Sequence, residues 1–411
     1  MRRRRRRSRV FRRRRIGPII GKILLWLLVI PALIGGYYLA EYLFNRPAEE
    51  PTVAPPTVTT PAETNPTTPT PDPEPEPEPE PKPDTTALRE MRAIYLPVKA
   101  LGNLAKWDAT LSAAHAAGYN AVIFDLKDAT GKVWYASATE WAKEARSVDE
   151  DALTVEQLQG AAATLKETYQ LTAIPRLFAF RDHTAPRYLE TARVSVKGNH
   201  SSVWYDNDPS AGGRRWLNPY APDATAYITS LAAELRSLGF SLLMLDGVQF
   251  PGQESQAYYG DEEQTALPRD EVLERFAQKM NETVGETGWL LSATALATVG
   301  EKTTVYGGNP VTYGAPAVSP WVIPDDMGSR LTVGGDKVSK PGDHPYEAAT
   351  LLFSQLKARL GLMEQPPVIV PWLQAEDYSA AQVAEEVRAL TEQFGENAPY
   401  ILYHPKGEYT F

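Results

Sequence analysis

Short apolar runs alternate with amphipathic stretches along the chain from Leu88 onward. The runs are bounded by turn-forming residues, as is typical of strands buried on both faces. They predict strands at 92–98, 121–126, 171–180, 241–250, 289–296, 317–324, 367–373 and 400–403. Between them, apolar residues recur at a spacing near 3.6, which predicts helices at 107–117, 154–169, 223–238, 269–284, 346–360 and 379–394.

This alternation of strands and helices indicates a parallel α/β fold. We predict that residues 88–411 form a (β/α)8 TIM barrel. A doubly wound sheet is the alternative, but no Gly-x-Gly-x-x-Gly pattern follows any predicted strand. In a barrel the functional residues gather at the carboxyl ends of the strands, so the strand ends are where chemistry should be sought.

The N-terminal region has a different pattern. Residues 1–15 are rich in Arg, and residues 16–44 are mostly apolar, with an uncharged run at 23–40 that is roughly 27 Å long at helical rise. The arginines before this run and Glu41 after it predict a single transmembrane anchor with a cytoplasmic N-terminus and an extracellular C-terminal domain. A cleaved signal peptide is the alternative, but the apolar run is longer than the usual hydrophobic region of such peptides, and no small-x-small cleavage site stands out.

Residues 45–87 are of low complexity and rich in Pro, Thr and Glu. Alternating Pro and like charges cannot build a core, and they favour an extended, polyproline-like chain. At about 3.1 Å per residue, such a chain reaches on the order of 120 Å. We therefore predict a disordered stalk that holds the barrel away from a lipid bilayer contacted by residues 16–44.

Composition and charge narrow the function classes. The chain has 411 residues with a formal net charge of -9, but eleven of its 42 Lys and Arg lie within residues 1–15. The remainder is therefore strongly acidic, which argues against a nucleic-acid partner. The absence of Cys excludes disulfides, thiolate metal sites and Cys nucleophiles.

The stretch from Ser241 to Gly252 contains the main candidate residue. Its apolar run ends in Asp246 and continues through Gly247 and Pro251. A charge at the end of a buried strand is costly unless it has a partner or a task. We therefore predict that Asp246 is the centre of a site. The alternative is that it caps the following loop or pairs with an Arg.

Other predicted strand ends carry carboxylates, amides and aromatic rings. Aromatic faces stack on sugar rings, and a pair of carboxyl groups can cleave a glycosidic bond. We assign candidate catalytic roles to Asp246, Asp325, Asp326 and Glu376. Candidate substrate-binding residues are Asp125, Asp128, Arg176, Trp216, Asn218, Gln249, Trp321, Trp372, Gln374 and His404. The alternatives are core packing for the Trp residues and, for Asp125 and Asp128, salt bridges with Lys127 or Arg176.

Other chemistries find little support in the sequence. The five His residues show no metal-ligand spacing such as His-x-x-x-His, so no metal site is predicted. There is no Gly-x-Ser-x-Gly elbow of a serine esterase and no Walker loop, and no cofactor is predicted.

The ordered set of strand-end motifs resembles a known family, the glycosyl-hydrolase-like domain of bacterial envelope proteins. This is a TIM-barrel group distantly related to the α-amylase-like glycosidases. The resemblance spans residues 92–411 and is carried by the motifs at 92–96, 120–128, 174–182, 216–220, 239–251, 318–321 and 370–374. It implies a carbohydrate-active barrel in which Asp246 takes the position of the family's fourth-strand carboxylate.

The chain departs from the family pattern at three strand ends. Gly247 and Gln249 stand where typical members carry Tyr and Arg, and Thr294 stands where they carry an Asp on the fifth strand. After the sixth strand, the pair Asp325-Asp326 replaces the usual Ser-His pair.

Two hypotheses follow. The first is a membrane-anchored glycoside hydrolase that acts on an envelope or extracellular polysaccharide, with Asp246 as nucleophile or base and Asp325, Asp326 or Glu376 as general acid. The two carboxyl groups would lie about 5–5.5 Å apart for retention or roughly 6.5–9.5 Å apart for inversion. The second is a degenerate barrel that binds a cell-wall glycan or a partner without turnover. It is motivated by Thr294, which stands where typical family members carry a fifth-strand carboxylate.

Overall fold

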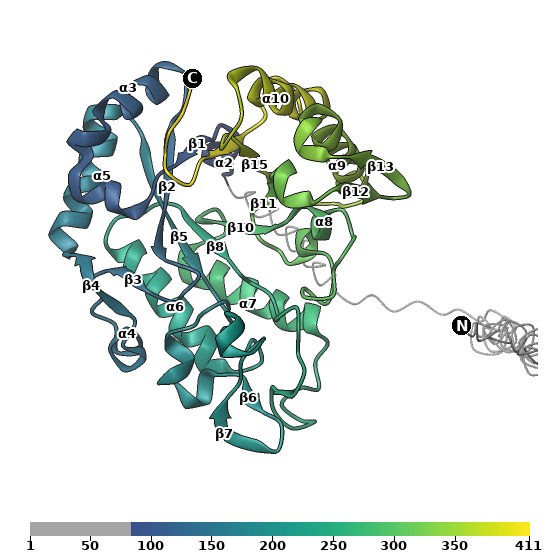
Figure 1. Cartoon of the computed structure of the whole chain (residues 1–411). Helices are drawn as coiled ribbons and strands as arrows, with labels where there is room; N and C mark the ends of the chain where they lie inside the picture. Colours follow the sequence, from purple (N-terminus) through teal and green to yellow (C-terminus); the bar gives the residue numbers. More distant parts are fainter. Residues whose placement is uncertain (1–83) are drawn as a thin grey trace, which may run out of the picture. The chain divides into compact units, whose positions relative to one another are not determined.

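A closed barrel of eight parallel strands forms the centre of the computed structural model, which describes residues 84–411 (Figure 1). In chain order the strands are β1 (Arg92–Tyr95), β2 (Ala121–Lys127), β5 (Thr172–Phe178), β8 (Leu243–Asp246), β10 (Trp289–Thr294), β11 (Ala317–Val322), β15 (Trp372–Gln374) and β16 (Tyr400–Tyr403). Strand β1 pairs with both β2 and β16, which closes the ring. The predicted TIM barrel is confirmed, and each predicted strand overlaps one of these eight.

The predicted cytoplasmic segment at 1–15, the membrane anchor at 16–44 and nearly all of the linker at 45–87 lie outside the described residues. Within residues 84–411, no helix is long and apolar enough to cross a membrane.

Helices surround the barrel on its outer side. They are α3 (Asp108–Ala116), α5 (Val155–Tyr169), α6 (Pro222–Ser237), α7 (Arg269–Val284), α8 (Ala295–Thr298), α9 (Pro345–Leu360) and α10 (Ala380–Phe394), while α2 (Thr86–Arg89) precedes β1. The sequence marks two of the helix starts with capping boxes, in which Thr154 pairs with Gln157 and Ser379 pairs with Gln382. All six predicted helices are present.

The barrel departs from a regular alternation at its fifth and seventh units. Between β10 and β11 the chain forms only the four-residue helix α8 and a three-residue 3-10 helix, η5 (Pro310–Thr312). The seventh strand is split into β14 (Val368–Ile369) and β15, with Pro371 between them. Proline has no N–H to give to a neighbouring strand, so the ladder is interrupted there, although the Pro371 carbonyl still accepts from the Ile401 N–H.

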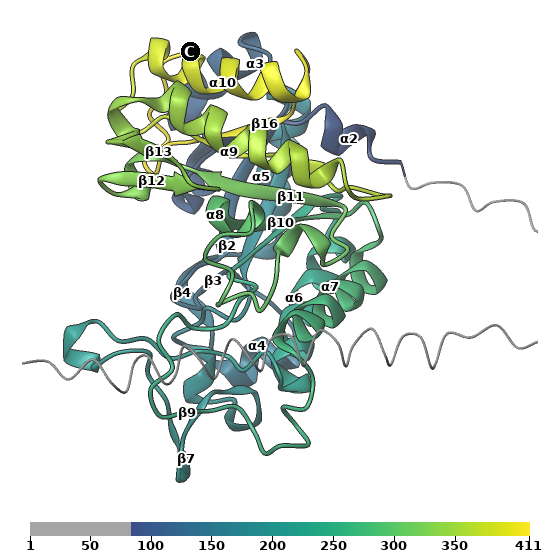
Figure 2. The ribbon, with the colours of Figure 1, turned by 90° about the vertical axis from the view of Figure 1, so that its right-hand side faces the viewer.

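Small substructures follow the carboxyl ends of several strands. Strand β3 (Val133–Tyr135), helix α4 (Glu140–Ala145) and strand β4 (Val148–Leu153) follow β2. A three-stranded antiparallel sheet joins β6 (Ser195–Val196) and β7 (Asn199–Val203), which follow β5, to β9 (Ala257–Tyr258), which follows β8. The hairpin of β12 (Arg330–Val333) and β13 (Asp336–Ser339) follows β11 and lies beside α9 (Figure 2).

Side chains of the barrel strands alternate between two cores. Residues such as Val122 and Leu245 pack outward against the helices, whereas Ile123, Ile174 and Met244 pack inside the barrel. Because side chains on a strand alternate with a period of two, the next inward positions are two residues further on. Those positions are polar, and they are Asp125, Arg176 and Asp246. The strand period thus places a charged layer on top of an apolar one.

Candidate active site

Asp246 ends β8 beside the guanidinium of Arg176, which projects from β5. Arg176 Nη1 lies 3.5 Å from Asp246 Oδ2, and the Gly247 N–H donates to Asp246 Oδ1 at 2.6 Å. The Asp246 side chain is 21% exposed, so one side of it remains open to solvent. The carboxylate is therefore oriented by two donors and is still accessible to a ligand.

A second carboxylate holds Arg176 in place. Asp125, opposite Arg176 in the pairing of β2 with β5, accepts from its Nε at 2.6 Å and from its Nη2 at 3.2 Å. Burial of Arg176 disfavours its charge, but Asp125 and Asp246 outweigh that effect and raise the pKa of Arg176. The guanidinium thus stays charged between two carboxylates.

Aromatic rings enclose the Arg176 guanidinium. Its central carbon lies 4.9 Å from the ring centre of Trp372, 5.0 Å from that of Phe178 and 5.4 Å from that of Tyr95. The Tyr95 hydroxyl also donates to Asp125 Oδ2 at 3.1 Å. Burial, and then the nearby Asp125 charge, raise the pKa of Tyr95. With its oxygens bonded to Arg176 and Tyr95, Asp125 serves to position Arg176.

A cavity of about 300 Å³ opens above this layer at the carboxyl ends of β5, β8, β10, β11 and β16. Its lining comprises Arg176, Phe178, Arg181, Asp246, Gln249, Ser292, Ala293, Thr294, Tyr306, Trp321 and Tyr403. The rings of Trp321 and Tyr403 pack edge to face with their centres 4.7 Å apart. Among the described residues that line the cavity, Asp246 is the only carboxylate. The structure therefore brings together four predicted site residues, namely Asp246, Arg176, Gln249 and Trp321.

The three predicted general-acid candidates lie outside this lining. Asp326 accepts a hydrogen bond of 2.8 Å from Trp321 Nε1, which connects it to the cavity wall, and its residue is exposed. Asp325 receives Gln374 Nε2 at 2.5 Å, and its own N–H donates to Gln374 Oε1 at 3.1 Å. Glu376 accepts from the same Gln374 Nε2 through its backbone carbonyl.

Gln374 is in turn held from behind by α10. Its backbone N–H donates to Glu386 Oε2 at 3.0 Å, and Glu386 is fully buried. Burial, with a further contribution from Asp325, raises the pKa of Glu386 well above its usual value. Gln374 is itself 2% exposed, so it positions Asp325 from below.

Four other predicted substrate-binding residues have structural contacts instead. Asp128 accepts from the N–H groups of its own loop and from Trp134 Nε1, so it holds the turn before β3. Trp216 is buried and donates to Asp206, and Asn218 is buried and donates to the Tyr259 carbonyl. Trp372 is 0% exposed beneath Arg176. In this conformation none of these four lines the Asp246 cavity.

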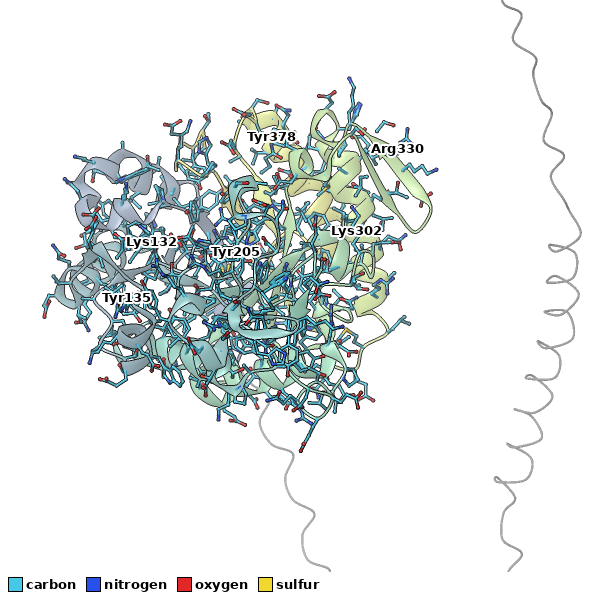
Figure 3. The ribbon with its side chains drawn as sticks, turned by 60° about the horizontal axis from the view of Figure 1, so that its bottom comes forward. Lys132, Tyr135, Tyr205, Lys302, Arg330 and Tyr378 are labelled. Carbon is cyan, nitrogen blue, oxygen red and sulfur yellow. The ribbon has the colours of Figure 1, made fainter. Side chains whose placement is uncertain are left out.

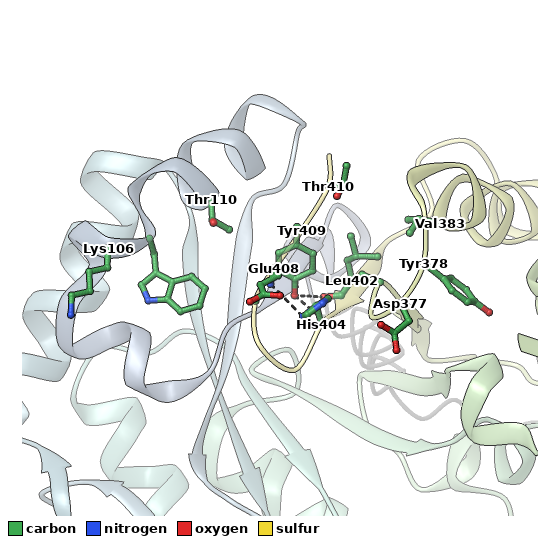
Figure 4. Close-up of a pocket in the computed structure, with 13 residues that line it drawn as sticks. Lys106, Thr110, Asp377, Tyr378, Val383, Leu402, His404, Glu408, Tyr409 and Thr410 are labelled. Atoms are coloured by element: carbon green, nitrogen blue, oxygen red, sulfur yellow. Dashed lines mark hydrogen bonds between the residues drawn. The ribbon is translucent and has the colours of Figure 1, made fainter.

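His404 lines a separate cavity of about 630 Å³ between the segment around Trp107 and the loop after β15 (Figure 4). Its Nδ1 accepts from the N–H groups of Lys406 and Glu408 at 3.2 and 3.3 Å. Tyr403 faces the Asp246 cavity, and the next residue, His404, faces this second one. The period of two along β16 therefore separates them.

Several lining residues were not selected from the sequence. Tyr403 ends a predicted strand, and Thr294 lies near the end of the strand predicted at 289–296, so their positions could have identified them. Arg181 follows a strand end, whereas Tyr306 comes from the loop after α8, where no sequence signal marks it. The Tyr306 hydroxyl accepts from the Thr294 N–H at 3.0 Å, and burial raises the pKa of Tyr306 to about 12.

No group of His, Asp and Glu side chains among residues 84–411 could hold a metal ion. The fold and the site define a (β/α)8-barrel protein. At its strand ends lie a carboxylate, a buried arginine and aromatic walls. The sequence matches a family model described as "Putative glycosyl hydrolase domain" over residues 93–409, and the chain belongs to this family. The resemblance found from the motifs is thereby confirmed.

Solved structures with a similar fold share little sequence with this chain. A hypothetical protein from Ruminiclostridium thermocellum ATCC 27405 is 20% identical over 48% of this chain and 96% of its own, with a TM-score of 0.41. The α-galactosidase from Thermus thermophilus is 10% identical over 77% and 58%, with a TM-score of 0.46. The glycoside hydrolase domain of PelA from Pseudomonas aeruginosa is 15% identical over 77% and 96%, with a TM-score of 0.39. No curated protein matches the chain in sequence.

Proposed function

We propose that this protein is a membrane-anchored, extracellular glycoside hydrolase that acts on a cell-envelope or extracellular polysaccharide. The observation that carries the proposal is the partly exposed Asp246 carboxylate in a cavity walled by Trp321 and Tyr403. Sugar rings present apolar faces to aromatic side chains, and the bond to be cleaved needs a carboxylate beside it. Family membership supports the same chemistry.

In this proposal Asp246 acts as nucleophile or base. Arg176 and the Gly247 N–H fix the orientation of its carboxylate, so its open side faces the cavity. Asp326 is the best-placed general acid of the three candidates, because Trp321 both lines the cavity and donates to Asp326. Asp326 would give its proton to the leaving glycosidic oxygen, while Asp246 attacks the anomeric carbon or activates water.

One observation favours a second function, glycan binding without turnover. Asp246 has no second carboxylate beside it in the cavity lining, and the end of β10 carries Thr294. A barrel with aromatic walls and a single carboxylate would hold a sugar without cleaving it.

The N-terminal pattern supports an anchored location. The Arg-rich segment at 1–15 and the apolar segment at 16–44 would keep the N-terminus in the cytoplasm, and the stalk at 45–87 would hold the barrel outside. In this arrangement the partners are a lipid bilayer and a polysaccharide or cell-wall glycan.

The test is release of reducing ends from a panel of bacterial wall and capsular glycans by the full chain. Asp246→Asn and Asp326→Asn are compared with Asp336→Asn, an exposed carboxylate on β13 that serves as the matched control. The hydrolase predicts release by the wild type and the control, with a loss on the order of 10²-fold or more in the other two variants. Glycan binding with no release by any of the proteins would establish the second function instead.

A further inference from the structure

The charged groups around the Asp246 cavity are unequally paired. Arg176 is held between Asp125 and Asp246 and is 5% exposed, so its charge is already compensated. Arg181, which lines the same cavity, is exposed and forms no ion pair within the described part of the chain. The cavity therefore offers one accessible, uncompensated guanidinium next to the candidate catalytic carboxylate.

The backbone of Gly247 makes room for Arg181. Gly247 has a φ of +61°, a left-handed conformation that side chains rarely adopt. A Cβ at this position would also lie 3.0 Å from the Cβ of Arg181. The absence of a side chain at residue 247 thus lets Arg181 stand against the end of β8.

Two further arginines lie close to this point. The Arg215 N–H donates to His183 Nδ1 at 3.2 Å, its Nη1 donates to the His183 carbonyl, and its Nε donates to the Tyr205 hydroxyl at 2.9 Å. Neither Arg214 nor Arg215 forms an ion pair with a carboxylate of residues 84–411, and both are half-buried. Figure 3 shows Tyr205, the partner of Arg215, in the middle of its view.

The pKa of a neighbouring histidine also reflects an excess of positive charge in this region. His183 follows Arg181 by two residues, and burial, followed by the charges of Arg215 and Arg214, lowers its pKa. Asp182 and Asp206 act in the opposite direction but are outweighed. Asp182 forms an ion pair of 2.7 Å with the buried Lys127, so the negative charge of Asp182 is already neutralised by that lysine.

We infer that Arg181, with Arg214 and Arg215 behind it, forms a cationic rim that binds the anionic groups of an acidic polysaccharide. The inference rests on the proposed function, because it assumes that the Asp246 cavity receives a glycan. The chain beyond residue 15 carries far more acidic than basic residues and would repel such a polymer. Recognition therefore depends first on Arg181, whose exposed guanidinium has no ion-pair partner among the described residues, while Arg214 and Arg215 add positive charge nearby.

Arginine suits either of two anionic groups that a glycan can carry. Its planar fork donates two parallel hydrogen bonds to a carboxylate or to a phosphate. The shared chemistry is an oxyanion on the chain that enters the cavity, supplied by a uronic acid in one case and by a phosphodiester linkage in the other.

The test measures binding of three polymers of similar length to the full chain by calorimetry. They are a polyuronate, a phosphodiester-linked polyol and a neutral glucan. Arg181→Ala and Arg181→Lys are compared with Arg330→Ala, which replaces an exposed arginine on the β12–β13 hairpin that is labelled at the upper right of the folded part in Figure 3. Every protein in this comparison also carries Asp246→Asn, so that turnover does not consume the polymers.

We expect Arg181→Ala to weaken binding of the preferred anionic polymer at least about tenfold, with Arg181→Lys intermediate and Arg330→Ala unchanged. The polymer that binds more tightly identifies the oxyanion. Equal binding of neutral and anionic polymers, or equal loss in Arg181→Ala and Arg330→Ala, would overturn the inference. Because binding is measured without turnover, a chain that never releases sugar can still satisfy this test, so the two proposals fail separately.

Discussion

Replacing Asp125 by Asn should destabilise the barrel by removing the partner of a buried charge. Arg176 is 5% exposed and Asp125 is 17% exposed, and the pair is joined by two hydrogen bonds. Loss of one partner from a buried ion pair typically costs 3–5 kcal/mol, because the remaining charge is left uncompensated.

The lower end of that range applies here. Asp246 remains 3.5 Å from Arg176, and the Asn oxygen can still accept one hydrogen bond, so we expect about 3 kcal/mol. At an unfolding entropy of about 2.1 cal/mol/K per residue, a folded part of about 330 residues loses about 4 °C of thermal midpoint for that change.

The assay is thermal unfolding of the full chain, monitored by circular dichroism. Glu140→Gln is the matched control, because it breaks an exposed ion pair with Lys143. The Glu140 side chain is 88% exposed and that of Lys143 is 57% exposed. Such surface pairs contribute little, so the control midpoint should stay near that of the wild type. The reasoning is refuted if Asp125→Asn unfolds within about 1 °C of the control, because the ion pair would then be effectively solvated.

Two further changes test contacts around the site. Burial raises the pKa of Glu386 above 4.5, so above that pH the folded protein holds a proton that the unfolded chain has released, and stability falls as pH rises. Glu386→Gln cannot ionise, so its midpoint should gain on the wild type between pH 5 and pH 8 in unfolding scans, and a constant difference would contradict the burial argument. The Tyr409 hydroxyl bonds the backbone N–H groups of Tyr95 and His404 and the Tyr95 carbonyl, so Tyr409→Phe should cost about 2 kcal/mol, or about 3 °C. The Tyr188 hydroxyl forms no hydrogen bond within residues 84–411, so Tyr188→Phe should leave the midpoint unchanged. Equal midpoints for Tyr409→Phe and Tyr188→Phe would contradict the role of Tyr409.

The strands and helices could be predicted because each leaves a local signature. Strands of a parallel barrel are buried on both faces, so their sequences are apolar runs. Thr154 and Ser379 are N-cap residues that mark the starts of two helices. Asp246 was predicted for the same reason, since a charge that ends such a run stands out. The closure of the barrel was inferred from the strand count, and the pairing of β1 with β16 confirms it.

The roles of the other candidate residues depended on contacts that no local pattern contains. Asp125 and Asp128 are three residues apart and look alike in the sequence. The period of two along β2 turns Asp125 into the barrel toward Arg176, whereas Asp128 lies beyond the strand and bonds its own turn. Trp321 and Trp372 are paired in register on β11 and β15, yet Trp321 lines the cavity whereas Trp372 is buried against Arg176.

The sequence by itself determined the (β/α)8 class, the order of the elements and the position of Asp246, because periodicity, caps and strand-end charges are local properties of the chain. Only the tertiary structure decided which side chains share the cavity. Arg181 faces it because Gly247 leaves space, and Tyr306 reaches it from a loop far along the chain. These proximities follow from closure of the sheet and from side-chain packing, which join residues that the sequence keeps far apart.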